Sequence, residues 1–107
     1  MVRVSRLISA AIAPVTSAII KTTNPRKAFH ARVITSAGAG SATVLILASN
    51  DLGVSWVTLA TLSLTAATTY AAGVQAGYNT DAAYETFAMQ LTAISGTGAV
   101  LDGYASN

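Results

Sequence analysis

The fold of this chain is decided by residues 42–64, which read ATVLILASNDLGVSWVTLATLSL. The first part, residues 42–48, is a short apolar run rich in β-branched side chains and bounded by turn residues. Such a run predicts a central strand that is buried on both faces. Residues 49–53 (SNDLG) supply turn chemistry, because Asn and Asp bond their own backbone and Gly accepts a positive φ.

The return strand is predicted over residues 55–64 (SWVTLATLSL). Its apolar residues change parity between Leu59 and Leu62, so that a regular strand would point them to opposite faces. We therefore predict a bulge or bend near Ala60, which would bring both residues back to the same face.

One strand is predicted before this pair and another after it. Residues 29–33 alternate apolar and polar side chains, which indicates a half-buried strand. Residues 84–94 (YETFAMQLTAI) alternate in the same way and form the clearest strand of the chain. One face of that strand is predicted to carry Phe87, Met89, Leu91 and Ala93.

The remaining segments of the second half are predicted to be turns and connections. Residues 36–41 (SAGAGS) indicate a flexible loop, and residues 65–82 a long connection with one weak strand near Tyr70. A tight turn at residues 95–98 (SGTG) lets residues 99–104 pair back as the final strand. Several short strands separated by turn signals predict an all-β fold, either an antiparallel β-sandwich or a jelly roll.

Charge is distributed very unevenly along the chain. All six Lys and Arg residues lie within the first 32 positions, and all four Asp and Glu residues follow position 50. An arm of one sign attached to a body of the other sign can bind a neighbouring copy. We therefore predict an extended, basic and apolar N-terminal arm (residues 1–27, ending near the turn signal TTNP) and a β-sandwich body (residues 28–107).

The composition predicts an oligomer. Charged residues make up 9% of the chain, whereas roughly a quarter is usual in a soluble domain. A domain of 107 residues leaves much of its surface exposed. Large apolar patches rarely stay in contact with water, so we expect other subunits to cover part of this surface.

The chain has too few nucleophilic, acid–base and metal-ligating residues in suitable combinations to predict catalysis or metal binding. It has one histidine, His30, and no cysteine, whereas metal sites need clustered ligands and a serine nucleophile needs a base. His30 is therefore interpreted as a solvated strand residue. The glycines at 38–40 and 96–98 lack the Lys-Ser/Thr ending of a phosphate-binding loop. We predict no enzymatic activity and no metal, cofactor or small-molecule substrate.

Neither nucleic acid nor a membrane is an expected partner. Six basic residues over 32 positions are sparse compared with a polybasic tail. The apolar run at residues 7–20 is interrupted by Pro14 and is shorter than the about 20 apolar residues that span a bilayer. We interpret this run as a surface that protein buries, not as a signal peptide.

Two stretches resemble small virion proteins of tailed bacteriophages. In those proteins a strand ends in Ser-Asn-Asp-Gly and is followed by a tryptophan and a Thr/Leu-rich return strand. Residues 42–56 show this pattern with Leu52 inserted before the glycine. Residues 91–99 (LTAISGTGA) resemble the ending of the same proteins, although Met89 and Gln90 stand where those chains often carry arginine.

The resemblance implies a virion structural protein, most specifically a capsid decoration (cement) protein that stabilises the shell by binding between capsid subunits. Its partners would be itself, as a homotrimer, and the major capsid protein, and its place would be the virion, assembled in the host cytoplasm. The alternative is a tail, fibre or receptor/glycan-binding β-sandwich module. That alternative needs Trp56 and the tyrosines to be exposed as a sugar-binding surface, whereas we expect Trp56 to pack in the core and the scattered tyrosines are as easily interface residues. The tyrosines are Tyr70, Tyr78, Tyr84 and Tyr104.

The interface is predicted to lie in the arm. Its apolar side chains would supply burial, and its basic side chains would fix the register against acidic partners. The predicted interface residues are Arg3, Arg6, Leu7, Ile8, Ile12, Val15, Ile19, Ile20, Lys21, Arg26 and Lys27.

Overall fold

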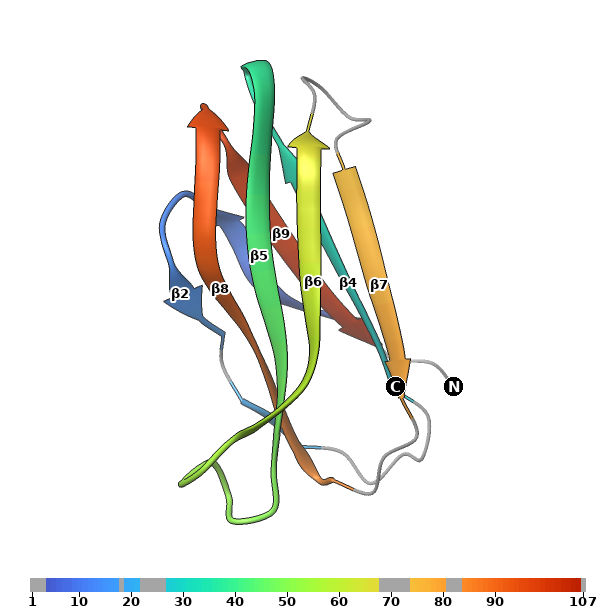
Figure 1. Cartoon of the computed structure of the whole chain (residues 1–107). Coiled ribbons are helices and arrows are strands. Elements are labelled where there is room, and N and C mark those ends of the chain that lie inside the picture. The colour runs from blue at the N-terminus through green and yellow to red at the C-terminus, as the bar shows by residue number, and fades with distance from the viewer. Residues whose placement is uncertain (1–3, 18, 22–26, 68–73, 81–83, 107) are drawn as a thin grey trace.

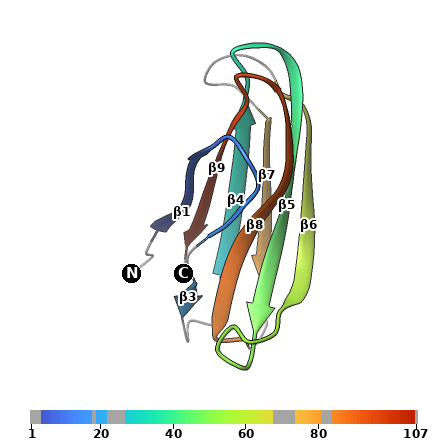
Figure 2. The ribbon, with the colours of Figure 1, turned by 90° about the vertical axis from the view of Figure 1, so that its left-hand side faces the viewer.

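The protein is an all-β sandwich in a computed structural model that describes residues 4–17, 19–21, 27–67, 74–80 and 84–106 (Figure 1). The strands of this described part are β1 (Val4–Ala11), β2 (Val15–Thr16), β3 (Ile20–Lys21), β4 (Lys27–Ile34), β5 (Ala37–Ser49), β6 (Val57–Ala67), β7 (Val74–Thr80), β8 (Thr86–Thr97) and β9 (Val100–Ser106). They form two antiparallel sheets packed face to face, as the edge-on view in Figure 2 shows. The predicted fold class is confirmed.

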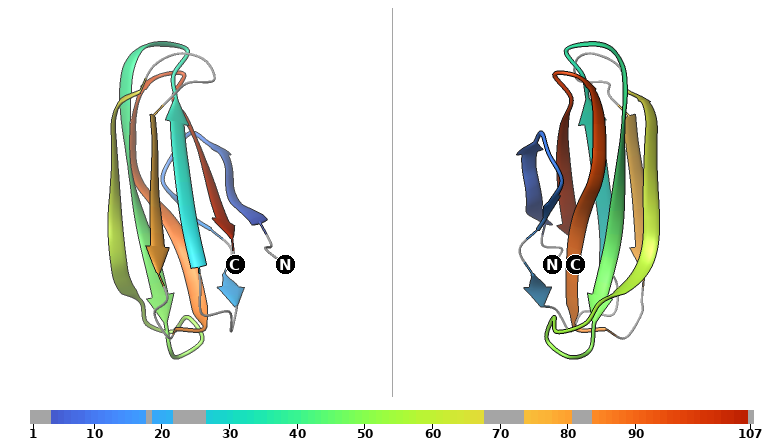
Figure 3. Two further views of the ribbon diagram at one scale, coloured as in Figure 1. Left: turned by 90° about the vertical axis from the view of Figure 1, so that its right-hand side faces the viewer. Right: turned by 60° about the vertical axis from the view of Figure 1, so that its left-hand side comes forward.

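The two sheets have the orders β1-β9-β4-β7 and β2-β8-β5-β6, and β3 also pairs with β8. On one side of the sandwich β6 contacts β7. On the opposite side the chain passes from β1, at the edge of the four-stranded sheet, to β2 and β3, at the edge of the five-stranded sheet (Figure 3). The N-terminal strands therefore close the side of the sandwich that β6 and β7 leave open.

The predicted central strand is β5, which lies between β8 and β6. Its inward side chains, Val44 and Ile46 among them, are fully buried. The prediction of burial on both faces is wrong for most of the strand, because Thr43 and Leu45 face outward and stay partly exposed. No third layer of described residues covers that face, and burial there is confined to Leu47 and Ser49 near the end of the strand.

The predicted bulge in the return strand is confirmed. Ile46 pairs with Ala60 and the next residue, Leu47, pairs with Thr58, so that Leu59 is the extra residue on β6. The strand begins at Val57, later than predicted. The preceding residues are held in the loop by side-chain hydrogen bonds that are described below.

The core forms between β4 and β8, as their alternation predicts. Phe29 in β4 and Phe87 in β8 are buried and their ring centroids lie 5.7 Å apart. The alternation of β8 fails after Leu91, because the register with β5 shifts there. Ala93 is therefore exposed, which corrects its predicted place on the buried face.

The predicted hairpin between the last two strands is wrong. β8 continues to Thr97, and β9 pairs with β1 and β4 of the other sheet. The chain crosses between the sheets at Gly98, whose φ is +63° and whose Cβ position would lie 2.2 Å from the Ser36 hydroxyl. Only glycine fits there without displacement. The crossing lets Leu101 and Ala105 of β9 face the core.

Two predicted loops are also corrected. Residues 36–41 largely belong to β5, and a Cβ at Gly40 would lie 2.5 Å from the Ser95 carbonyl oxygen of β8. The glycine content of this segment therefore reflects close strand approach more than flexibility. In the predicted long connection, β6 extends to Ala67 and β7 forms a further strand, whereas Tyr70 lies outside the described residues.

Candidate interaction surfaces

The described part of the predicted arm lies along the edges of its own body. β1 pairs with β9, and its side chain Ile8 is 3% exposed and belongs to the core. β2 and β3 then pair with β8 through two residues each. Between them, Ser17 N–H donates to the Met89 carbonyl over 2.8 Å, and Ser17 Oγ accepts from Met89 N–H over 2.9 Å. Contact of this segment with another subunit stays a prediction.

The apolar residues predicted for the interface fall into two sets. Ile8 is buried, and Leu7 and Ile20 are partly buried against the core. Ile12 is 74% exposed, and Val15 and Ile19 are nearly half exposed. Within the described chain, this second set is the part of the predicted interface whose apolar side chains are exposed.

The basic residues predicted for the interface are also divided. Lys21 is exposed on β3. Lys27 begins β4, is 6% exposed, and has its ammonium nitrogen 5.0 Å from the centre of the Phe87 ring, so it packs inside the chain. Arg3 and Arg26 lie outside the described residues.

Arg6 of β1 forms an ion pair with Asp102 of β9, and Ala10 N–H donates to the same carboxylate oxygen over 2.8 Å. Burial raises the pKa of Asp102, but the hydrogen bonds from Arg6 and Ala10 and the charges of Arg6 and Arg32 outweigh burial and lower it. At this pair a basic residue of the N-terminal segment meets an acidic residue of the body within one chain, and the contact fastens the N-terminal strand.

The loop between β5 and β6 is held by the Asp51 carboxylate. Ser49 Oγ donates to Asp51 Oδ1 over 2.6 Å, and Ser55 N–H donates to the same oxygen over 2.9 Å. Ser55 Oγ donates to Oδ2. These bonds lower the pKa of Asp51 to about 2, with the Ser49 hydroxyl as the largest cause and Ser55 next. The loop is ordered by its own side chains.

This loop exposes apolar side chains at one end of the sandwich. Leu52 and Val54 are 70% and 85% exposed, and Val57 is half exposed. A Cβ at Gly53 would lie 3.1 Å from both the Trp56 ring and Ile19 Cδ1, so the arm contacts the loop here. We call Ile19, Leu52, Val54, Trp56 and Val57 the apolar tip. Trp56 is partly buried in this loop and is not part of the core cluster, which corrects its predicted place.

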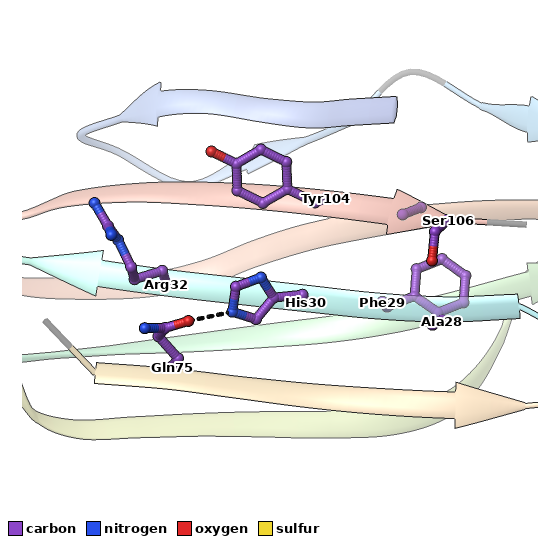
Figure 4. Close-up of a pocket in the computed structure, with 8 residues that line it drawn as sticks. Ala28, Phe29, His30, Arg32, Gln75, Tyr104 and Ser106 are labelled. Carbon is purple, nitrogen blue, oxygen red and sulfur yellow. Dashed lines mark hydrogen bonds between the residues drawn. The ribbon is translucent and has the colours of Figure 1, made fainter. Parts of the chain in front are cut away.

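A second surface covers the outer face of the four-stranded sheet. His30 of β4 lies beside Tyr104 of β9, with ring centroids 6.0 Å apart and an interplanar angle of 23°. His30 Nε2 is 2.6 Å from Gln75 Oε1 of β7. Together with Arg32 they line a depression of about 490 Å³ (Figure 4). Sequence analysis singles out His30 and Tyr104 separately but does not bring them together, because it does not predict the pairing of β4 with β9.

Neither a cluster of metal-ligating side chains nor a membrane-spanning helix occurs among the described residues. They contain no group of three or more His, Cys, Asp or Glu side chains that could hold a metal ion. The same ranges contain no helix with the length and hydropathy needed to cross a membrane.

No protein family model and no curated protein matches this chain. Among solved structures, it is similar to the SPBc2 prophage-derived protein YomS, with a TM-score of 0.63 and 11% sequence identity. The match covers 100% of this chain and 94% of that chain. At this identity the likeness shows a shared fold, and it links that fold to a protein of prophage origin.

Proposed function

We propose that this protein is a structural component of a bacteriophage virion and serves as a decoration (cement) protein that binds between capsid subunits. The observation that carries the proposal is the apolar tip, which presents large aliphatic side chains on a loop that is already ordered. The fold shared with a prophage-derived protein supports the phage context. The proposed place is the virion, assembled in the host cytoplasm.

The conformation of the tip favours a binding role. Leu52 has a φ of +60°, a region that a branched or bulky residue enters only at an energetic cost. Such backbone strain persists where the surrounding structure enforces it, and it concentrates at functional sites. Here the Asp51 hydrogen bonds enforce it, and the result is an outward-pointing leucine. Because the loop is ordered before contact, little conformational entropy is lost on binding.

The arm would extend the same interface. Ile19 joins the tip, and Ile12 and Val15 add exposed apolar side chains on the segment that carries β2. Burying each large aliphatic side chain stabilises a complex by roughly 1.5–3 kcal/mol. The proposed partners are a groove of the major capsid protein and further copies of this chain in a homotrimer, with exposed Lys21 facing acidic side chains.

A glycan-binding module that uses Trp56 as its platform is less well supported. The Trp56 ring lies against Gly53 and is only partly exposed, so its surface for stacking is reduced. We also infer a binding role without catalysis.

Co-sedimentation with shells tests the proposal. Particles of the phage that encodes the protein, stripped of it, are mixed with the full chain and with the double variant Leu52→Asp, Val54→Asp. Two exposed charges in the tip oppose burial, so the variant is expected to stay in the supernatant. The matched control is Ala39→Asp, an exposed small residue near the start of β5, at the end of that strand remote from the Asp51 loop, which should bind like the wild type. Shell binding by the double variant, or no binding by the wild type, would overturn the proposal.

A further inference from the structure

We propose that copies of this chain exchange their first strand, so that residues 4–9 of one copy pair with β9 of a neighbouring copy. We call residues 10–14 (AAIAP) the hinge. In the closed form described above, β1 lies on its own body and the hinge leads from one sheet toward the other (Figure 3). The inference rests on the self-association in the proposed function and does not depend on binding to the shell.

The surface beneath β1 is shaped for one particular side chain. Ile8 lies opposite Gly103 of β9 and is 3% exposed. A Cβ at Gly103 would lie 3.3 Å from Ile8 Cβ and 3.1 Å from the Met89 sulfur, so the glycine leaves a socket that Ile8 fills. Departure of β1 would expose this apolar socket to water, which is unfavourable. The strand that fits the vacated socket is the β1 of another copy.

The charges at this junction also match β1 to β9. The Asp102 carboxylate of β9 accepts hydrogen bonds from the Arg6 guanidinium and, over 2.8 Å, from Ala10 N–H. Both donors precede the hinge bond that would rotate, because a change in the φ of Ala10 leaves its N–H in place. A neighbouring β1 would therefore restore both contacts. Since exchange keeps these interactions, the hinge decides between the closed and the exchanged form.

The hinge is short and strained in the closed form. Ala10 has a φ of +49°, a region that residues other than glycine seldom adopt, and it stands where the register with β9 shifts. Pro14 fixes its own φ and favours an extended conformation at Ala13. Residues 12–14 alone separate β1 from β2. A short connection under strain favours strand exchange, because straightening the chain relieves the strain.

The hinge is also poorly packed in the closed form. Ile12 is 74% exposed, and the side chains of Ala13 and Pro14 are exposed as well. The residues that line a depression of about 460 Å³ here all belong to the range 7–17, so the connection forms an open arch. Extended at about 3.3 Å per residue, the hinge spans roughly 16 Å and reaches a body that packs on this side. Ile12 and Val15 would then be buried between copies, which favours association.

Engineered disulfides test the proposal, because the chain has no cysteine of its own. Ser5 of β1 and Ala105 of β9 are register partners, and antiparallel partners have Cα atoms about 4.5–5.5 Å apart, within the range of a disulfide. The variant Ser5→Cys, Ala105→Cys is oxidised in its native state and run on a denaturing, non-reducing gel. Exchange predicts mostly covalent dimers or trimers. The matched control Thr43→Cys, Ser63→Cys links paired residues of β5 and β6 and should give monomers.

Hinge variants provide a second test that needs no disulfide. Ala10→Gly removes the strain of the closed form, so self-association should weaken by about fivefold in light scattering on dilution. Ser9→Gly is the matched control, because Ser9 has no positive φ, and it should associate like the wild type. Inserting Gly-Ser-Gly after Ala13 lengthens the hinge and should favour monomers.

The outcomes separate strand exchange from shell binding. The double variant Leu52→Asp, Val54→Asp changes the apolar tip and should still form exchanged oligomers, while Ala10→Gly keeps the tip intact. Covalent monomers from the Ser5→Cys, Ala105→Cys variant would overturn the exchange, whether the native protein is a monomer or an oligomer that meets through another surface. An oligomer unchanged by the hinge insertion would overturn it as well.

Discussion

Two aspartates hold two different regions of this molecule, and they do so over different sequence distances. Asp51 finds its partners, Ser49 and Ser55, within four residues of itself. Asp102 finds Arg6 and Ala10 more than ninety residues away. The first organises a loop that can form its geometry locally. The second fastens the N-terminal strand to β9 and depends on the whole fold. Stability and binding should therefore respond differently to changes at the two carboxylates.

The largest expected loss of stability comes from Asp102→Ala. The change removes the charged acceptor of Ala10 N–H and the ion partner of Arg6, and a hydrogen bond to a charged group contributes about 2 kcal/mol. Because Arg6 is half exposed, water screens its share of that loss. Urea unfolding measures the global change, and hydrogen exchange should show lost protection in β1. Arg6→Gln is the matched control with a smaller expected effect. Unchanged exchange in β1 would contradict the role given to Asp102.

Lowering the pH should destabilise the fold through both aspartates. The folded chain lowers the pKa of Asp51 from 3.8 to about 2, and it also lowers that of Asp102. The unfolded chain therefore takes up protons first, so the stabilisation is complete above about pH 5 and is lost as the pH falls through 4 toward 2. Thermal unfolding from pH 7 to pH 2 measures the loss. Asp102→Asn should remove one part of the pH dependence and Asp51→Asn another. A variant with the wild-type pH profile would show that its carboxylate is not linked to folding.

Ser49→Ala tests the hydrogen bonds that hold the Asp51 loop, and it should lower stability less than Asp102→Ala. Ser49 is 1% exposed, and its hydroxyl donates to Asp51 and accepts from Asp51 N–H and Gly53 N–H. Its removal should lower the free energy of unfolding by about 1 kcal/mol. Hydrogen exchange should then rise in residues 50–56 while β1 keeps its protection. A loss of protection in β1 would contradict the independence of the two regions.

The same contrast explains what the sequence predicts well. The turn at Asp51 and the bulge at Leu59 follow from neighbouring residues, because turn chemistry and side-chain parity are local. The half-buried alternation of β4 is local too. The exposure of Leu52 was also visible in principle, since it is an apolar residue inside a turn.

Non-local pairings could not be predicted in this way. The crossing at Gly98 places β9 in the other sheet and not in the expected hairpin with β8. Glycine is required there because a side chain would clash with Ser36, which is far away in the sequence. The contact between His30 and Tyr104 depends on that crossing, because the crossing places β9 beside β4. The charge split alone likewise predicts contact between chains, whereas the fold brings Arg6 to Asp102 within one chain.

Leu52→Asn should change stability least and shell binding strongly, which makes it the sharpest test of the apolar tip. Asparagine tolerates a φ of +60° better than leucine does. The free energy of unfolding should therefore stay unchanged or rise by about 0.3 kcal/mol. The variant also removes an aliphatic side chain that is 70% exposed and contributes little to the fold. Co-sedimentation with shells should weaken by about tenfold, because burial of that side chain is lost. Thr58→Asn, on the exposed start of β6, is the matched control and should bind normally. A stabilised variant that binds like the wild type would mean that the strain at Leu52 serves no contact with the shell.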